Sequence, residues 1–409
     1  MFENKKIKLP LLIIVFFYLY SVQFIFFGGV GSRAIMGLLG AGLFVFSVTN
    51  MKSSLKKIRI AVSLLMISVV SLISIFINRT TDFEFIIYPI SVVLILFAGY
   101  FVYYFFRQKY NEINFALIAE YLVIAVLVQV FVALLQFVFP ALMAFLGQYI
   151  LYEESVEIFS DMRLIGLGSQ YFGAGLTNGF ALLLIAYLIK NSCSSLIRML
   201  YLIIAYILIF VLGMMMARTT IVGAILSVCF LFLKSSMKVN VRSLRRGLSV
   251  FFLLIGSFVL LSSLFSDIRE KQDVLFDFAF EMFINYVESG EITTESTDRL
   301  QEMYVFPSNL STWLIGDGLF SDPTGDGYYM QTDVGYLRII YYSGLIGLLL
   351  FIFYQYLLID YINVKTNWQN RLFLFFIFSY MLVCNIKGFT DLTSYCVLFM
   401  FCERKSISL

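Results

Sequence analysis

Arg218 is the only charged residue within residues 199–233, a stretch of 35 residues. This stretch is too long for one membrane-spanning helix, which needs about 20 apolar residues, and just long enough for two. Arg218 therefore marks the tip of a tight helical hairpin. An arginine presents a planar fork of donors that suits phosphate, so the residue is a candidate for binding an anion. The alternative is a charge that only marks the outer side of the membrane.

A short helix is predicted around Arg299. Asp298 and Gln301 have the spacing of a capping box, and Pro307 is expected to end the helix. Arg299 would then lie at the helix start, where the first backbone N–H groups also favour an anion. The alternative for an arginine in a polar loop is a solvated charge without a ligand.

Asp333 lies where this polar loop enters the next apolar stretch. Partial burial at that depth would raise the pKa of its carboxyl toward that of a general base. The alternative role is an N-cap for the following helix. Arg338, five residues on, is expected to neutralise Asp333 or to assist it with a substrate phosphate.

Three other charges are weaker candidates. Lys387 and Asp391 are four residues apart, so a local ion pair is expected, with phosphate binding by Lys387 as the alternative. Arg163 is a further candidate phosphate contact. Glu120 is an intramembrane carboxylate without an obvious partner, for which the alternatives are proton coupling and a position near the inner interface.

Arginines around one carboxylate suit transfer from a membrane-borne lipid diphosphate. The arginines would hold the diphosphate and stabilise the charge on the leaving group, while the carboxylate takes a proton from the attacking sugar hydroxyl. The sequence has no Walker loop, dinucleotide fingerprint or esterase elbow. It has no histidine and no cysteine cluster on the outer side, so no metal and no other cofactor is expected.

The elements that must position these residues are apolar helices. The chain is 61% hydrophobic and 13% charged, with a mean hydropathy of +0.91, which predicts an all-α polytopic membrane protein in a single membrane domain, 1–409. We expect about twelve transmembrane helices, at 9–27, 31–49, 60–77, 85–106, 115–139, 172–189, 199–216, 219–234, 248–265, 336–359, 372–386 and 392–402. The first follows three lysines and is expected to be a signal anchor.

The basic residues predict the orientation. With the N-terminus inside, 20 of the 29 Lys and Arg residues fall on the cytoplasmic side, and twelve spans place both termini there. The net charge of +3 reflects this segregation, so no nucleic-acid partner is expected. Two segments then lie outside: 140–171 and the larger loop 266–335.

The larger loop carries 14 of the 26 acidic residues. Connections longer than about 12–15 residues are usually functional or disordered, so the chemistry is expected here. In its first part, five acidic residues form one stripe of an amphipathic helix that is predicted to lie against the membrane interface or cap the bundle: Glu270, Asp273, Asp277, Glu281 and Glu288.

Three short elements resemble those of the O-antigen/capsule polymerase (Wzy-type) and O-antigen ligase superfamily of bacterial membrane glycosyltransferases. They are MARTTIVGA with Arg218, STDRLQEMY with Arg299, and WLIGDGLF followed by TDVGYLRIIYYSGLIG. The topology is also similar, with one dominant outer loop before the last spans. The ligases carry a histidine near the end of this loop, where this chain has Asp333, so the resemblance favours a polymerase.

The resemblance implies a GT-C-like glycosyltransferase in the bacterial cytoplasmic (inner) membrane with its active site facing outside. It would be inverting and independent of metal. Asp333 and Arg299 would be catalytic, and the diphosphate would be bound by Arg218, Arg299, Arg338, Lys387 and Arg163. Expected partners are polyprenyl-diphosphate-linked oligosaccharide donor and acceptor, membrane lipids and a chain-length regulator protein. The alternatives are a ligase-type glycan transferase and a lipid-linked oligosaccharide flippase or exporter.

Overall fold

The described part of the chain is helical. The computed structural model describes residues 7–47, 55–152, 156, 159–160, 162–169, 171–191, 196–233, 249, 269–291, 293–325, 327–366 and 371–402. The helices are α1 (Leu9–Tyr20), α2 (Ser32–Ser47), α3 (Leu55–Asn78), α4 (Glu84–Lys109), α5 (Phe115–Val138), α6 (Pro140–Leu146), α8 (Tyr171–Asn191), α9 (Leu196–Met216), α10 (Thr220–Phe232), α12 (Arg269–Ser289), α13 (Glu295–Glu302), α14 (Leu310–Leu314), α15 (Gly335–Thr366), α16 (Arg371–Cys384) and α17 (Thr393–Met400), with 3-10 turns η1 (Ile25–Phe27) and η2 (Tyr329–Gln331).

Several of these helices have the length and composition of membrane spans. Among the described residues six qualify: Ile58–Asn78, Glu84–Lys109, Phe115–Val138, Tyr171–Asn191, Ile197–Met216 and Gly335–Ile362. Four shorter apolar helices accompany them: Leu9–Tyr20, Ser32–Phe46, Thr220–Phe232 and Arg371–Cys384. Because lipid offers no hydrogen bonds to a backbone, helices satisfy their own N–H and C=O groups there. The chain is therefore a helical, multi-pass membrane protein.

Some helices are shorter than the sequence predicts. Helix α1 ends at Tyr20 rather than near residue 27, because Ser21 takes a left-handed conformation (φ 49°) and the turn η1 follows. Helices α16 and α17 have 14 and 8 residues, and each is shorter than the range expected for it, 372–386 and 392–402 respectively. The expected span 248–265 lies outside the described residues except for residue 249.

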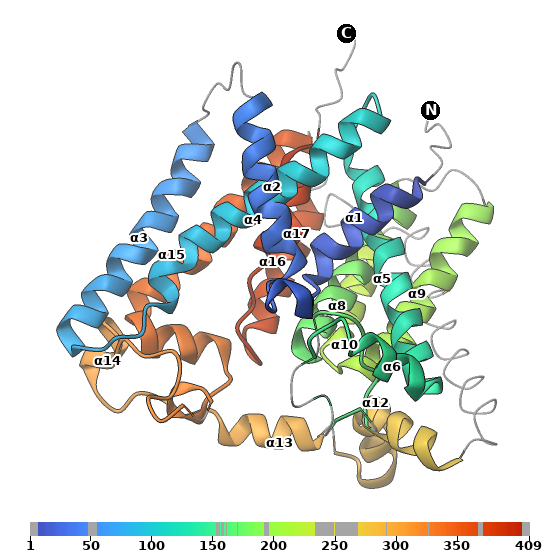
Figure 1. The fold of residues 1–409 in the computed structure, drawn as a ribbon. Helices are drawn as coiled ribbons and strands as arrows, with labels where there is room; N and C mark the ends of the chain where they lie inside the picture. The colour runs from blue at the N-terminus through green and yellow to red at the C-terminus, as the bar shows by residue number, and fades with distance from the viewer. Residues whose placement is uncertain are drawn as a thin grey trace.

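The helices form a bundle that is covered at one end by the segment from α12 to α14 (Figure 1). We call this end the loop end. Helix α6 also lies there, whereas α1 begins and α17 ends toward the opposite end (Figure 1). In the described residues of the predicted loop 266–335, the helices α12, α13 and α14 and the turn η2 lie beside the bundle (Figure 1).

Close packing of α10 on α8 fixes the tip that carries Arg218. Gly223 lies so near Gly179 that a Cβ on Gly223 would come within 2.2 Å of the Cα of Gly179. Small residues permit this approach of two helix backbones. Helix α8 is itself enclosed, because 83% of its most apolar stretch is buried inside the protein. The α9–α10 tip is thus held at a defined depth at the loop end.

Helix α15 is interrupted near its first third, at Ser343 and Gly344. Gly344 has φ +67°, which favours glycine, and the break frees backbone carbonyls from the helix ladder. The turn after α14 satisfies them, because the N–H groups of Asp317 and Gly318 donate to the carbonyls of Tyr341 and Tyr342. The glycine-rich WLIGDGLF element therefore supplies hydrogen-bond donors to the carbonyls at the break in α15 and joins the loop to the bundle.

Candidate functional site

A cavity of about 220 Å³ lies at the loop end. Residues from seven separate segments line it: Arg163, Tyr171, Phe172, Ala217, Arg218, Thr219, Phe278, Ser296, Arg299, Leu300, Met303, Asp333 and Lys387. Five of the six predicted site residues are in this set. Four of them are cations and one is a carboxylate, so the lining is strongly basic. Arg338, the sixth, does not line the cavity and lies behind Asp333.

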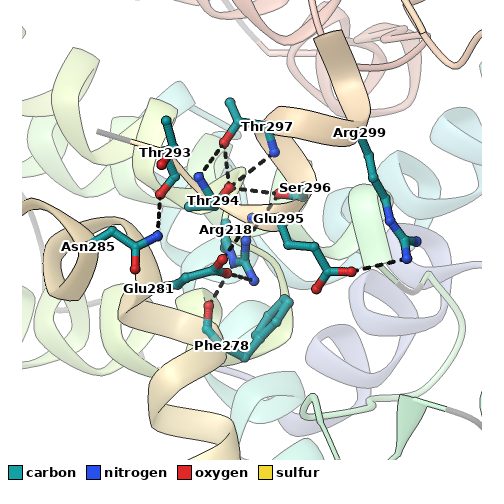
Figure 2. Close-up of polar contacts among 10 residues, drawn as sticks. All are labelled: Arg218, Phe278, Glu281, Asn285, Thr293, Thr294, Glu295, Ser296, Thr297 and Arg299. Atoms are coloured by element: carbon teal, nitrogen blue, oxygen red, sulfur yellow. Dashed lines mark hydrogen bonds and ion pairs between the residues drawn. The ribbon is translucent and has the colours of Figure 1, made fainter. Parts of the chain in front are cut away.

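Arg218 is held by the loop helices at every nitrogen of its guanidinium (Figure 2). Its Nε donates to the backbone oxygen of Phe278 at 2.7 Å, and Nη1 donates to the Ser296 hydroxyl at 3.2 Å. Nη2 pairs with Glu281 at 2.5 Å, and the Phe278 ring lies 4.2 Å from the guanidinium carbon. Arg218 therefore anchors α12 and α13 to the α9–α10 tip as well as facing the cavity.

The short helix around Arg299 begins four residues earlier than the sequence predicts. Thr294 is the N-cap of α13, and it forms a reciprocal capping box with Thr297 in place of the predicted pair Asp298 and Gln301. Arg299 consequently lies in the last turn of α13, so the expected anion site at the helix start is wrong for this residue.

The Arg299 side chain is largely exposed and pairs within its own helix. It contacts Glu295 at 3.0 Å, with 69% of the Arg299 side chain and 71% of the Glu295 side chain exposed (Figure 2). A pair this exposed is worth little in stability, on the order of 0–1 kcal/mol. Helix α13 ends at Glu302, so Pro307 does not terminate it as predicted.

Arg163 lies among aromatic rings rather than carboxylates. Its guanidinium carbon is 4.4 Å from the centre of the Phe278 ring, 5.2 Å from that of Phe159 and 5.7 Å from that of Tyr171. Its Nε is buried without a hydrogen-bond partner among the described residues. Burial and, next, the charge of Arg218 lower the pKa of Arg163. An arginine remains charged even so, and a buried charge lacking a partner favours an anionic ligand.

Backbone contacts fix the segment that carries Arg163. The N–H of Leu164 donates to the carbonyl of Met215 at the end of α9, and the Gln129 amide of α5 donates to the carbonyl of Leu167. The N–H of Ser169 donates to the carbonyl of Tyr20. Residues 162–169, a described part of the predicted segment 140–171, are thus tied to three bundle helices, which bring Arg163 beside the tip with Arg218.

Lys387 and Asp391 do not form the predicted ion pair. The carboxylate of Asp391 accepts from Tyr88, Gln355 and Thr393 inside the bundle. Lys387 instead lines the cavity, and its amine has no carboxylate within ion-pair distance among the described residues. Burial, followed by the charges of Arg218 and Arg163, lowers the pKa of Lys387. Lys387 is therefore a second cation that lacks an acidic partner.

Asp333 faces the cavity with 38% of its side chain exposed. Burial raises the pKa of its carboxyl, while Arg338 and Lys387 lower it to a lesser extent, so the predicted direction of the shift is confirmed. The nearest cation among the described residues is Arg338, at 3.7 Å, and within that part of the chain Asp333 accepts no N-cap bond; the Val334 N–H donates to the Thr332 hydroxyl. A carboxyl whose pKa is raised is a better proton acceptor, which suits a general base.

Two contacts place Asp333 at the cavity. The Thr332 hydroxyl donates to the carbonyl of Met303, which joins the entrance of α15 to the end of α13. Gly335 packs against the loop between α16 and α17, where a Cβ would come within 2.6 Å of the Gly388 carbonyl oxygen. This close approach brings Asp333 beside Lys387.

Arg338 takes the first of its two predicted roles, because its guanidinium pairs with the Asp333 carboxylate at 3.7 Å. Its guanidinium carbon lies 3.8 Å from the centre of the Phe320 ring and 3.6 Å from that of Tyr328, and 8% of the residue is exposed. The stacking contacts hold Phe320 and Tyr328 on α15, and the charge of Arg338 counters that of Asp333. Direct contact between Arg338 and a ligand in the cavity is not supported.

Glu120 also differs from expectation, because it has a partner. Its carboxylate pairs with Arg198 at the start of α9, which ties α5 to α9. Neither residue lines the cavity. The pair is a structural contact between two helices, so the structure gives no support to proton coupling at Glu120.

Glu281, Phe278 and Ser296, which all contact Arg218, are partners that sequence reasoning missed. The sequence places Glu281 in an acidic stripe, of which Asp277 and Glu288 are exposed as expected. Glu281 instead turns toward Arg218, with 25% of its side chain exposed. The available signal was the three-residue spacing of Phe278 and Glu281, which puts both on one side of α12.

Comparison of the chain with protein-family models, curated proteins and solved structures finds no match.

Proposed function

We propose that this chain is a polysaccharide polymerase that transfers a growing glycan from a polyprenyl diphosphate carrier to the non-reducing end of a new lipid-linked repeat unit. The observation that carries the proposal is the cavity, in which Arg163, Arg218, Lys387 and Asp333 meet from four distant parts of the sequence. A basic pocket with one carboxylate, at the end of a membrane bundle, suits a lipid-bound diphosphate and a hydroxyl acceptor.

The proposal includes a GT-C-like topology with twelve spans in the bacterial cytoplasmic membrane. Both termini would be cytoplasmic, and the loop end would face outside. The basic residues of the sequence support this orientation. Nucleotide sugars are absent outside the cell, so a lipid diphosphate is the activated donor that would be available to a cavity on that side.

The residues have separate roles in the proposed reaction. The Asp333 carboxylate takes the proton of the acceptor hydroxyl, whose oxygen attacks the anomeric carbon. The bond from that carbon to the diphosphate oxygen breaks, and its electron pair leaves with the diphosphate. Arg163, Arg218 and Lys387 hold that group and stabilise its growing negative charge. A single direct displacement inverts the anomeric configuration.

Deletion of the gene, followed by analysis of lipid-linked glycans, tests the function. Accumulation of single repeat units outside the membrane is expected for a polymerase. Full-length polymer that is not attached to its final acceptor would indicate a ligase. Repeat units that remain inside would indicate a flippase or exporter, and either of these results would contradict the proposal.

The base is tested by Asp333→Asn in the complemented deletion strain. Loss of a general base is expected to lower the rate of polymer formation by about 10²–10⁴-fold, with normal abundance of the protein in the membrane. The matched control is Glu302→Gln, since Glu302 is an exposed carboxylate on α13 that does not line the cavity. Full activity of Asp333→Asn would remove Asp333 as the base.

A further inference from the structure

Glu281 contacts two different parts of the cavity wall, one with each carboxylate oxygen. Its Oε2 pairs with Nη2 of Arg218 at 2.5 Å, and its Oε1 accepts from the backbone N–H of Glu295 at 2.7 Å (Figure 2). Glu295 is the first residue of α13, where N–H groups have no partner inside the helix. One side chain of α12 therefore joins the α9–α10 tip to the start of α13.

The contact leaves part of Arg218 available to a ligand. A guanidinium has five N–H donors. Phe278, Ser296 and Glu281 each accept from one of them, so two remain on a group that lines the cavity. A carboxylate that occupied the phosphate position would bind the guanidinium of Arg218 with both of its oxygens. Glu281 does not, because its second oxygen is engaged by α13.

Helix α13 also depends on this contact for its position. It supplies Ser296, Arg299, Leu300 and Met303 to the cavity lining. A second tie lies one turn further along α12, where the Asn285 amide donates to the carbonyl of Thr293 at 2.9 Å (Figure 2). The Asn285 tie holds the same segment but has no contact with Arg218, so it provides a matched comparison.

We propose that Glu281 is a positioning residue for the anion site: it orients Arg218 toward the cavity and fixes α13 as the adjoining wall. The inference rests on the proposed function, since it takes the ligand to be a diphosphate. Orienting a long arginine side chain before binding lowers the entropy cost of binding. Glu281 thus strengthens anion binding although it carries a negative charge itself.

The test is binding of inorganic pyrophosphate to the full-length protein in lipid nanodiscs. Glu281→Ala is expected to bind pyrophosphate about tenfold more weakly than the wild type, the effect of one charge-assisted hydrogen bond on the orientation of Arg218. Tighter binding by Glu281→Ala would show that the carboxylate competes with the anion and would overturn the inference. Absence of binding to the wild type would overturn it too.

A double-mutant cycle tests whether Glu281 acts through Arg218. In the Arg218→Gln background, Glu281→Ala is expected to cause no further weakening, because the group that it orients is gone. Equal weakening in both backgrounds would overturn the inference. Asn285→Ala, which loosens α12 from α13 without touching Arg218, is expected to have a smaller effect than Glu281→Ala; an equal effect would reduce Glu281 to a tether between helices.

Two further variants protect the test against loss of folding. Glu288→Ala removes an exposed carboxylate two turns along α12 and is expected to bind like the wild type. Glu281→Asp keeps the charge on a side chain that is one methylene shorter and is expected to give an intermediate weakening, which serves if the alanine variant is not found in the membrane. Unchanged binding by Glu281→Asp would contradict the need for both contacts.

Polymer formation by the same preparations separates this inference from the proposed function. Pyrophosphate binding with coupling between Glu281 and Arg218, but without polymer, would contradict the function and leave the inference standing. Polymer formation without coupling between Glu281 and Arg218 would support the proposed function and contradict this inference.

Discussion

The cations of the cavity come from two walls that differ in their partners. Arg218 and Arg299 contact carboxylates of the loop helices, Glu281 and Glu295, and we call them the paired wall. Arg163 and Lys387 belong to the segments 162–169 and 385–392, and among the described residues neither has an acidic partner within ion-pair distance. We call them the unpaired wall.

The difference teaches that a charge in a site can serve the fold or the ligand. On the paired wall, the carboxylates already supply most of the neutralisation, so these arginines anchor α12 and α13 in addition to facing the cavity. On the unpaired wall, no acidic partner among the described residues compensates the desolvation of the cations. An incoming anion gains most from the unpaired wall, although the sequence ranks Arg218 above Arg163 and Lys387.

Among the cations of the cavity, the largest expected effect is therefore that of Arg163→Gln. Removing a desolvated cation that lacks a partner is expected to lower the rate of polymer formation at low substrate by about 100-fold, which corresponds to about 3 kcal/mol. Arg163→Lys keeps the charge but not the planar stacking among the rings, so a partial loss is expected. Rates from membranes with equal amounts of each protein check this. If Arg163→Gln loses less activity than Arg218→Lys, the proposed difference between the two walls is wrong.

Arg218→Lys is expected to give a loss of about tenfold. The lysine retains the charge but cannot contact Phe278, Ser296 and Glu281 together, so the loop helices loosen. Limited proteolysis in the segment between α12 and α13 is the second measurement, since release of the anchor should increase cleavage there. Normal protection combined with loss of activity would assign Arg218 to the ligand alone.

Lys387→Gln is expected to change the pH dependence of the reaction as well as its rate. The Asp333 base acts only when ionised, so activity is present above its pKa and is lost as the pH falls through it. Burial raises this pKa, and the charges of Arg338 and Lys387 lower it. Removing the lysine charge should therefore move the acid limb of the pH–rate profile to higher pH. An unchanged acid limb would separate Lys387 from Asp333 or remove Asp333 as the base.

The smallest effect is expected for Arg299→Gln, within about twofold of the wild-type rate. Its side chain is largely exposed, and its partner Glu295 lies on the same helix, so solvent screens the charge. The chain length of the polymer is a suitable measurement, with Glu295→Gln as the control that removes only the partner. A loss comparable to that of Arg163→Gln would return Arg299 to the central role that the sequence suggests.

Sequence reasoning found every charged residue that lines the cavity and the pairing of Asp333 with Arg338, but not the partners of Arg218 and Arg299. Arg163, Arg218, Arg299, Lys387 and Asp333 stand out because charges are costly beside apolar spans, so their presence requires a reason. The start of α13 was misplaced because Thr294 competes with Asp298 as a cap, and local sequence does not decide between two caps. The predicted ion pair of Lys387 with Asp391 does not form, because the Asp391 carboxylate accepts hydrogen bonds from Tyr88, Gln355 and Thr393 within the bundle.

The sequence by itself determined that this is a helical membrane protein, since apolar stretches of spanning length and a low charge content permit few other structures. It also determined which side chains carry the available charge. Only the tertiary structure decided which charges are neutralised by distant parts of the sequence, because Glu281 reaches Arg218, and Arg198 reaches Glu120, through the packing of helices. That decision matters for chemistry, because a cation that has no acidic partner among the described residues, such as Arg163 or Lys387, is the one that remains for a ligand.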